Sequence, residues 1–126
     1  MNMREDASEL QQMIWALQAL AAPAQDQRQL FPGNVCVACE LVGDFENWLG
    51  ASKWRPGLLT PRQLEALGAV ANVLALMEET PCFSDVEFLS RADWVRLRKE
   101  ATAALRSCGW SNDLPPSDRS AYVQAD

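Results

Sequence analysis

The sequence predicts an all-α fold, a single-domain bundle of four main helices with one short extra helical turn. Four segments repeat apolar residues at intervals of three and four, which is the spacing of one face of a helix. No segment alternates apolar and polar residues as a half-buried strand does. A chain of 126 residues fits one domain, and helices joined by short loops favour antiparallel packing. We expect residues 1–110 to form the bundle and residues 111–126 a flexible C-terminal tail that is mobile or draped over the bundle.

The first helix is predicted to begin at a capping residue, Asp6 or Ser8, and to end near Ala22, just before Pro23. Its apolar stripe consists of Leu10, Met13, Ile14, Leu17 and Ala21. The segment that follows, residues 24–34, is polar and then turn-like, so we expect a loop there.

The second helix is predicted over residues 35–49. Asn34 is a candidate for its N-terminal cap, and Gly50 is a residue type that commonly ends helices. Its apolar stripe consists of Val35, Cys39, Val42, Phe45 and Leu49.

The third helix has the clearest start in the chain. Thr60 is a capping residue, Pro61 suits the first helical position, and Gln63 completes a capping box. We expect this helix to end at Thr80-Pro81. Its stripe is wide, which indicates a central position, and consists of Leu64, Leu67, Val70, Ala71, Val73, Leu74 and Met77.

The last helical segment follows two overlapping capping boxes, Ser84 with Glu87 and Ser90 with Asp93. They predict a short helical turn over residues 85–89 and a final helix that starts at Arg91 and ends before Gly109. The inner stripe of the final helix consists of Trp94, Leu97, Ala101, Leu105 and Cys108.

The charge balance indicates a basic protein partner. Asp and Glu number 17 against 11 Lys and Arg, and the net charge of −6 repels nucleic-acid backbones and anionic membranes. The chain has no histidine, the side chain that most often serves as a catalytic base. We therefore expect a non-catalytic protein without a cofactor. The N-terminus lacks the apolar core of a signal peptide and no run spans a membrane, so we expect a cytoplasmic protein with reduced cysteines.

The cysteines allow a redox or metal alternative. Cys36 and Cys39 form a C-x-x-C motif at a predicted helix start, where the helix dipole stabilises a thiolate. No strand precedes the motif, as a thioredoxin-like site requires. A four-thiolate zinc site would need Cys82 and Cys108 as well, but these two stand alone instead of forming a second pair. We therefore interpret the cysteines as core residues.

The second predicted helix carries an acidic cluster of Glu40, Asp44 and Glu46, followed by Trp48. Glu40 and Asp44 are four residues apart, where like charges weaken a helix by a few tenths of a kcal/mol. One interpretation is a solvated helix face that Arg or Lys residues of the fold neutralise. The other is a patch that binds a basic protein surface, with Trp48 as an aromatic anchor.

The final helix is basic, and it carries Arg91, Arg96, Arg98, Lys99 and Arg106. We expect these cations to neutralise the acidic second helix inside the fold instead of binding nucleic acid. Among the five tryptophans, Trp94 is predicted to be buried, and Trp15 and Trp54 are candidates for exposed interface residues.

One family resemblance runs through residues 30–110. The residues that carry it are Leu30-Phe31-Pro32-Gly33, Val35-Cys36, Glu40-Leu41, Asp44-Phe45 and Asn47-Trp48, then Leu59-Thr60, Gln63 and Trp94-Val95-Arg96. This order resembles short helical proteins of proteobacteria, some of which look like immunity partners of secreted or contact-delivered toxins. The resemblance implies a protein that occludes the active or substrate surface of a basic toxin. Those proteins commonly have an acidic residue where this chain has Cys39.

The leading hypothesis is therefore an acidic immunity or antitoxin-like protein that binds a basic toxin through Glu40, Asp44, Glu46 and Trp48. Two alternatives stay open at this point. One is a thiol-redox or zinc protein centred on Cys36 and Cys39, and the other is a structural module that self-associates through aromatic side chains.

Overall fold

The computed structural model describes residues 3–31, 36–53, 55–77 and 91–116, with side chains from residue 9 onward. Five helices occur in these ranges, which confirms the all-α prediction. They are α1 (Met3–Ala21), α2 (Ala24–Gln29), α3 (Val37–Lys53), α4 (Pro61–Leu76) and α5 (Ala92–Cys108). The predicted turn over residues 85–89 lies outside the described residues.

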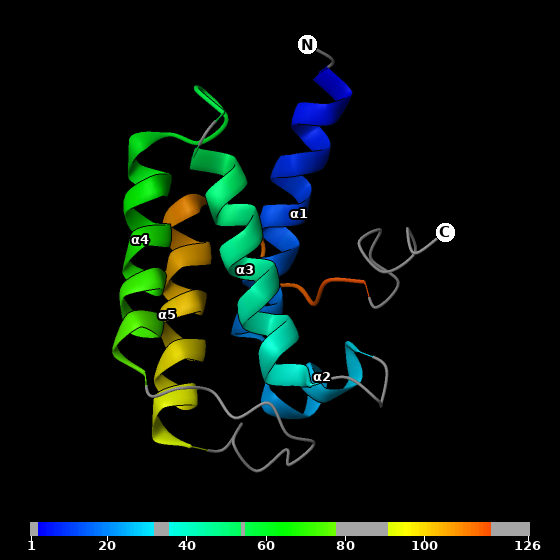
Figure 1. Cartoon of the computed structure of the whole chain (residues 1–126), viewed down its shortest axis with the longest axis vertical. Helices are drawn as coiled ribbons and strands as arrows, with labels where there is room; N and C mark the ends of the chain where they lie inside the picture. The colour runs from blue at the N-terminus through cyan, green and yellow to red at the C-terminus, as the bar shows by residue number, and fades with distance from the viewer. Residues whose placement is uncertain (1–2, 32–35, 54, 78–90, 117–126) are drawn as a thin grey trace.

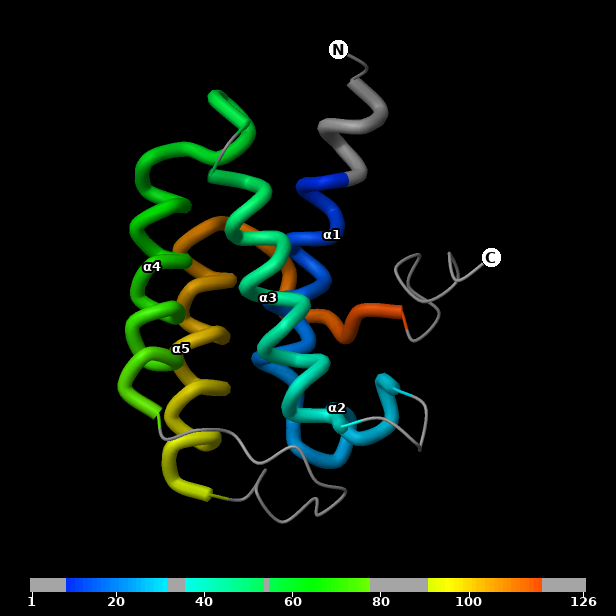
Figure 2. The backbone as a smooth tube through the Cα atoms, viewed as in Figure 1, coloured from blue at the N-terminus to red at the C-terminus, as the bar shows by residue number. Residues whose placement is uncertain are grey.

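The four long helices form an antiparallel bundle (Figures 1 and 2). Helix α1 packs against α3 and α5, and α5 packs against α4 as well. Helices α3 and α4 contact each other only sparsely. The short α2 lies at the end of the bundle where α1 finishes and α3 begins (Figure 1). The predicted bundle architecture is therefore confirmed, and α3 and α4 are joined much more loosely than the three pairs α1–α3, α1–α5 and α4–α5.

The core lies along the bundle axis and takes its largest side chains from all four long helices. Its fully buried apolar residues include Met13, Leu17, Leu20, Leu41, Phe45, Leu67, Val70, Trp94, Leu97 and Leu105. Burying each large apolar side chain is worth about 1.5–3 kcal/mol relative to leaving it in water. This shared core holds the long helices together as one unit.

Helix α1 starts earlier than the sequence predicts. Both predicted caps, Asp6 and Ser8, lie inside the helix, which begins at Met3. Capping residue types also occur within helices, so their identity alone did not fix the start. The predicted stripe is right at Met13 and Leu17, while Ala16, Ala19 and Leu20 widen the buried face.

Helix α2 was missed, because residues 24–34 were predicted as a loop. Pro23 stands at its N-cap position, and the side chain of Gln27 is fully buried. The Gln27 Nε2 group donates hydrogen bonds to the carbonyls of Ala19 and Leu20, at 3.0 and 3.1 Å. A polar segment thus folds because one amide side chain satisfies carbonyl groups at the end of α1.

Helix α3 begins at Val37 and ends at Lys53, so the predicted stop at Gly50 is wrong. A glycine inside a helix costs about 1 kcal/mol, which the burial of the neighbouring Leu49 offsets. The predicted cap Asn34 lies outside the described residues.

Helix α4 starts as predicted. Gln63 N–H donates to Thr60 Oγ1 at 3.1 Å, and Thr60 N–H donates to Gln63 Oε1 at 3.0 Å. The helix ends at Leu76, ahead of the expected end at Thr80-Pro81.

Helix α5 also agrees with its prediction at the C-terminal end. Its whole predicted stripe is buried, and Gly109 ends the helix in the left-handed conformation with φ of 76°. The N-cap residue is Arg91, one position after the predicted cap Ser90, which lies outside the described residues, and the Arg91 side chain donates to Asp93 at 2.7 Å.

The first part of the predicted tail lies against the bundle. Gln18 Nε2 donates to the carbonyl of Ser111 at 2.9 Å, Trp110 packs against the core, and Pro115 is buried. The start of the predicted tail is therefore held against α1 at Ser111, and residues 117–126 lie outside the described part of the chain.

Candidate functional site

Helix α3 carries the predicted acidic site and is placed mainly by its contact with α1. Ala38, Leu41, Phe45 and Leu49 are buried at helical spacing and face the core. At the N-terminus, the Cys39 N–H group donates to Cys36 Sγ at 3.4 Å, so a thiol takes the position of a capping group. The opposite face of α3 is left to solvent.

The three carboxylates of α3 do not form one cluster. Glu40 and Asp44 are four residues apart, half-buried, and on the same side of the helix. At about 100° per residue, Glu46 lies about 120° around the helix from Glu40, and it is exposed. Between these two edges the outward face presents Gly43 and Asn47, both exposed.

Glu40 has a structural role that does not depend on any partner. It lies in the first turn of α3, where a negative charge near the N-terminal end of the helix dipole contributes about 0.3–1 kcal/mol. Within the described ranges, neither Glu40 nor Glu46 has an ion-pair partner, whereas Asp44 does make a polar interaction. Two of the three carboxylates are thus available to an external cation.

Trp48 is half-buried and packs against the core instead of projecting into solvent. It lies four residues after Asp44, on the same side of α3. Trp15 is also half-buried, and Trp54 lies outside the described residues. Trp48 is therefore only partly accessible to a partner.

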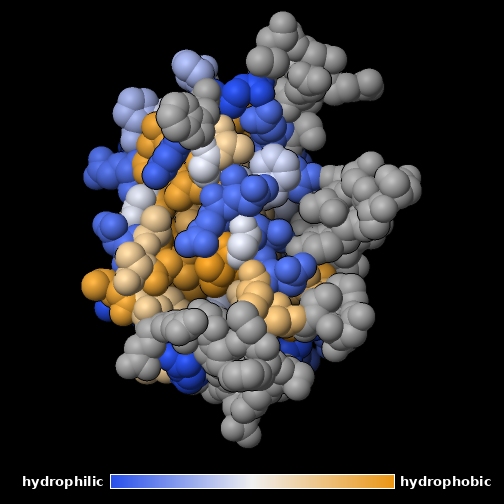
Figure 3. Space-filling model, viewed as in Figure 1, coloured by the Kyte–Doolittle hydropathy of each residue, from blue (hydrophilic) through white to orange (hydrophobic). Residues whose placement is uncertain are grey.

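An apolar surface adjoins α3 where it meets α4. Figure 3 shows hydrophobic side chains gathered over α4 and along its border with α3, next to polar side chains of α3. Partly buried apolar residues of these helices include Val42, Leu64, Ala71 and Leu74. The spacing of these residues in the sequence predicts that they lie in buried core stripes. Their partial exposure follows from the sparse α3–α4 contact, which no pattern within a single helix reveals.

Helix α5 does not neutralise α3, so that prediction is wrong. The close neighbours of α5 are α4 and α1, and in Figure 1 it lies beside α4. Arg91 pairs with Asp93 on its own helix, and Arg98 Nη1 donates to Gln27 Oε1 of α2 at 3.3 Å. Burial of the Arg98 guanidinium lowers its pKa from the ordinary value by removing solvent from the charged form.

The cysteines differ from the prediction that all four are thiols. Cys39 is disulfide-bonded, whereas Cys36 and Cys108 are free, so Cys36 and Cys39 are not bonded to each other. Burial raises the pKa of the Cys108 thiol, because the thiolate loses solvation. Cys82 lies outside the described residues.

The described residues contain neither a metal-binding cluster nor a membrane-spanning helix. In the ranges that the structure describes, no group of three or more His, Cys, Asp or Glu side chains is arranged to hold a metal ion. None of the described helices combines the length and apolar character needed to cross a membrane. Comparisons with protein families, with curated proteins and with solved structures find no match for this chain.

Proposed function

We propose that this chain is a non-catalytic binding protein that docks on a basic protein surface through the outward face of α3. The observation that carries the proposal is the position of Glu40 and Glu46, two carboxylates without ion-pair partners in the described ranges, at the edges of that face. The neighbouring apolar surface of α3 and α4 adds area that a partner could bury (Figure 3). Protein interfaces commonly combine an apolar centre with a polar rim.

We further propose that the partner is a basic toxin and that the chain is a bacterial immunity or antitoxin-like protein. The net charge of −6 supports this proposal, because opposite charges accelerate and orient association. Toxins that cleave nucleic acid are often basic because they bind phosphates. Occlusion of a catalytic or substrate surface requires no active site in the immunity protein, and the chain contains no histidine.

The test starts from the products of neighbouring genes, which are co-expressed with this chain and purified as complexes. Affinity is then measured across salt concentrations for Glu40→Lys/Glu46→Lys and for the control Glu65→Lys, an exposed carboxylate on α4. At low salt, we expect the double variant to bind the partner at least roughly tenfold more weakly than the native chain. The affinity of the control should change little. A partner whose salt-dependent affinity is unchanged in the double variant would contradict the assignment to α3.

A growth assay tests the toxin proposal separately. Expression of the partner alone should arrest growth, and co-expression of this chain should restore it. If the partner binds but does not arrest growth, the proposed docking through α3 is retained and the proposed immunity role is contradicted.

We also propose a cytoplasmic location, which the disulfide at Cys39 makes testable. Disulfides persist mainly in oxidising compartments. An alkylating reagent added at cell lysis modifies only cysteines that are reduced in the cell. If the protein resides in the cytoplasm, Cys39 should be alkylated. An intact disulfide in freshly lysed cells would place the protein in an oxidising compartment.

A further inference from the structure

The outward face of α5 carries a row of cations that the fold does not use. Arg96, Lys99 and Arg106 are exposed and lie on one side of the helix at intervals of three and seven residues, with the exposed Ala103 between them. In the part of the chain that the structure describes, none of the three has an ion-pair or hydrogen-bond partner. We call these three residues the α5 basic face.

These unpaired cations contrast with the chain as a whole, in which acidic residues outnumber basic ones by 17 to 11. Other arginines have partners, since Arg55 pairs with Glu9 and Arg91 with Asp93. Like charges at a spacing of three residues repel by a few tenths of a kcal/mol. An anionic ligand would relieve this repulsion.

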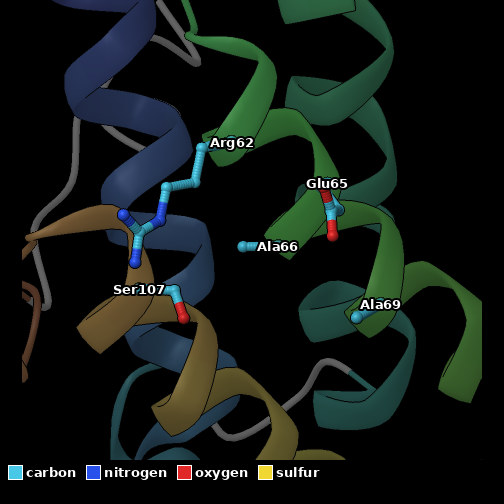
Figure 4. A pocket seen from close by; sticks show the side chains of 5 residues that line it. All are labelled: Arg62, Glu65, Ala66, Ala69 and Ser107. Atoms are coloured by element: carbon cyan, nitrogen blue, oxygen red, sulfur yellow. The ribbon is translucent and has the colours of Figure 1, made fainter.

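A hollow lies beside the C-terminal end of the α5 basic face, between α4 and α5. Its volume is about 420 Å³, and its lining residues are Arg62, Glu65, Ala66, Ala69 and Ser107. Figure 4 shows the Arg62 side chain reaching from α4 toward Ser107, with the methyl group of Ala66 near it and that of Ala69 farther along α4. Arg62 is exposed and has no ion-pair partner in the described ranges. The hollow thus offers a small apolar surface next to a fourth cation.

We propose that the α5 basic face and this hollow bind an acidic amphipathic helix of a partner protein. From Arg96 to Arg106 the row is about 15 Å long at 1.5 Å per residue, which matches carboxylates repeated along one face of a helix. An apolar side chain next to these carboxylates fits the alanine methyls of the hollow. This face belongs to a different helix from the acidic site on α3, so the inference does not rest on the proposed function.

The charges around the row favour discrete carboxylates over a nucleic-acid backbone. Glu65 lines the hollow, and Glu100 lies beside Arg96 and Lys99 on α5. A continuous phosphate chain would pass close to these carboxylates and would be repelled by them. A partner helix can instead place its charges only where the cations lie.

The test uses a synthetic peptide with glutamates at helical spacing on one face and a leucine beside them, and its glutamine analogue. We expect the glutamate peptide to bind the full chain at about 0.05 M salt and at least roughly tenfold more tightly than the glutamine peptide. Lys99→Glu/Arg106→Glu should reduce binding at least about tenfold. The matched control Arg28→Glu/Lys53→Glu alters net charge equally at exposed sites on α2 and α3, and it should retain most of the affinity.

The hollow is tested by Ala69→Leu, which fills it without a change of charge and should weaken binding several-fold. Circular dichroism of each variant shows whether the fold is intact. If the control loses as much affinity as the Lys99→Glu/Arg106→Glu variant, the loss depends only on net charge and the proposal is overturned. A single-stranded oligonucleotide that binds more tightly than the glutamate peptide at the same salt would overturn it in favour of a nucleic-acid surface.

Discussion

Helices α3 and α5 carry opposite charges on their outward faces, and the bundle holds them in different ways. Helix α5 packs against both α1 and α4, and Arg98 joins it to the buried Gln27. Helix α3 packs mainly against α1 and leaves its α4 side open. A closely packed helix has little apolar surface to offer and presents its charges as a fixed row. A loosely packed helix adds apolar surface beside its charges.

Substitution of one tryptophan in each helix should show this difference most strongly. Trp94 on α5 is fully buried, so Trp94→Ala should lower the free energy of unfolding by about 3–5 kcal/mol. Trp48 on α3 is half-buried, and Trp48→Ala should cost about 1–2 kcal/mol. Urea unfolding of both variants measures the two losses. Equal losses would mean that α3 is as closely packed as α5.

The next largest effect should come from the residue that anchors α5 to the end of the bundle. Gln27→Ala removes two hydrogen bonds to α1 carbonyls and the contact with Arg98, which should cost about 1–3 kcal/mol. The control Gln29→Ala, at an exposed position on the same short helix, should change stability by less than about 0.5 kcal/mol. Similar losses in both variants would show that α2 stabilises the fold through its helix alone.

The sequence predicted the helices whose signals are local. At α4, the Thr60 capping box specifies its own geometry within four residues, and both of its hydrogen bonds form. At α5, the spacing of the apolar residues and Gly109 identify the buried face and the end. These features need no information from the rest of the chain.

The predictions that were wrong concern residues whose environment depends on contacts between segments far apart in the sequence. Gln27 is polar, and only its position beside the end of α1 explains why it is buried. Gly50 continues a helix because neighbouring residues are packed against α1. The candidate site is similar: Glu40 and Glu46 could be named from the sequence, but their separation and the apolar surface beside them depend on how α3 sits in the bundle.

The glycines of the two helices should respond in opposite directions to the same substitution. Gly109 ends α5 with φ of 76°, a conformation that costs an alanine about 1 kcal/mol, so Gly109→Ala should destabilise. Gly43 lies within α3 at an exposed position where an added Cβ meets no atom within 4 Å. Gly43→Ala should therefore stabilise by about 0.5–1 kcal/mol. Thermal unfolding measures both shifts, and destabilisation by Gly43→Ala would indicate that α3 is strained.

The smallest effect concerns the free thiols at the start of α3 and the end of α5. Thiolates are the reactive form, and burial raises the pKa of Cys108, so at a given pH less of its thiolate is present than for an ordinary thiol. Cys36 is half-exposed, and Cys108 is buried. At pH about 8.5, Cys36 should thus react faster than Cys108 with an alkylating reagent, as measured by mass spectrometry of the peptides. In denaturant the two rates should become similar, and a Cys108 as reactive as Cys36 in the native protein would show that the last turn of α5 opens readily.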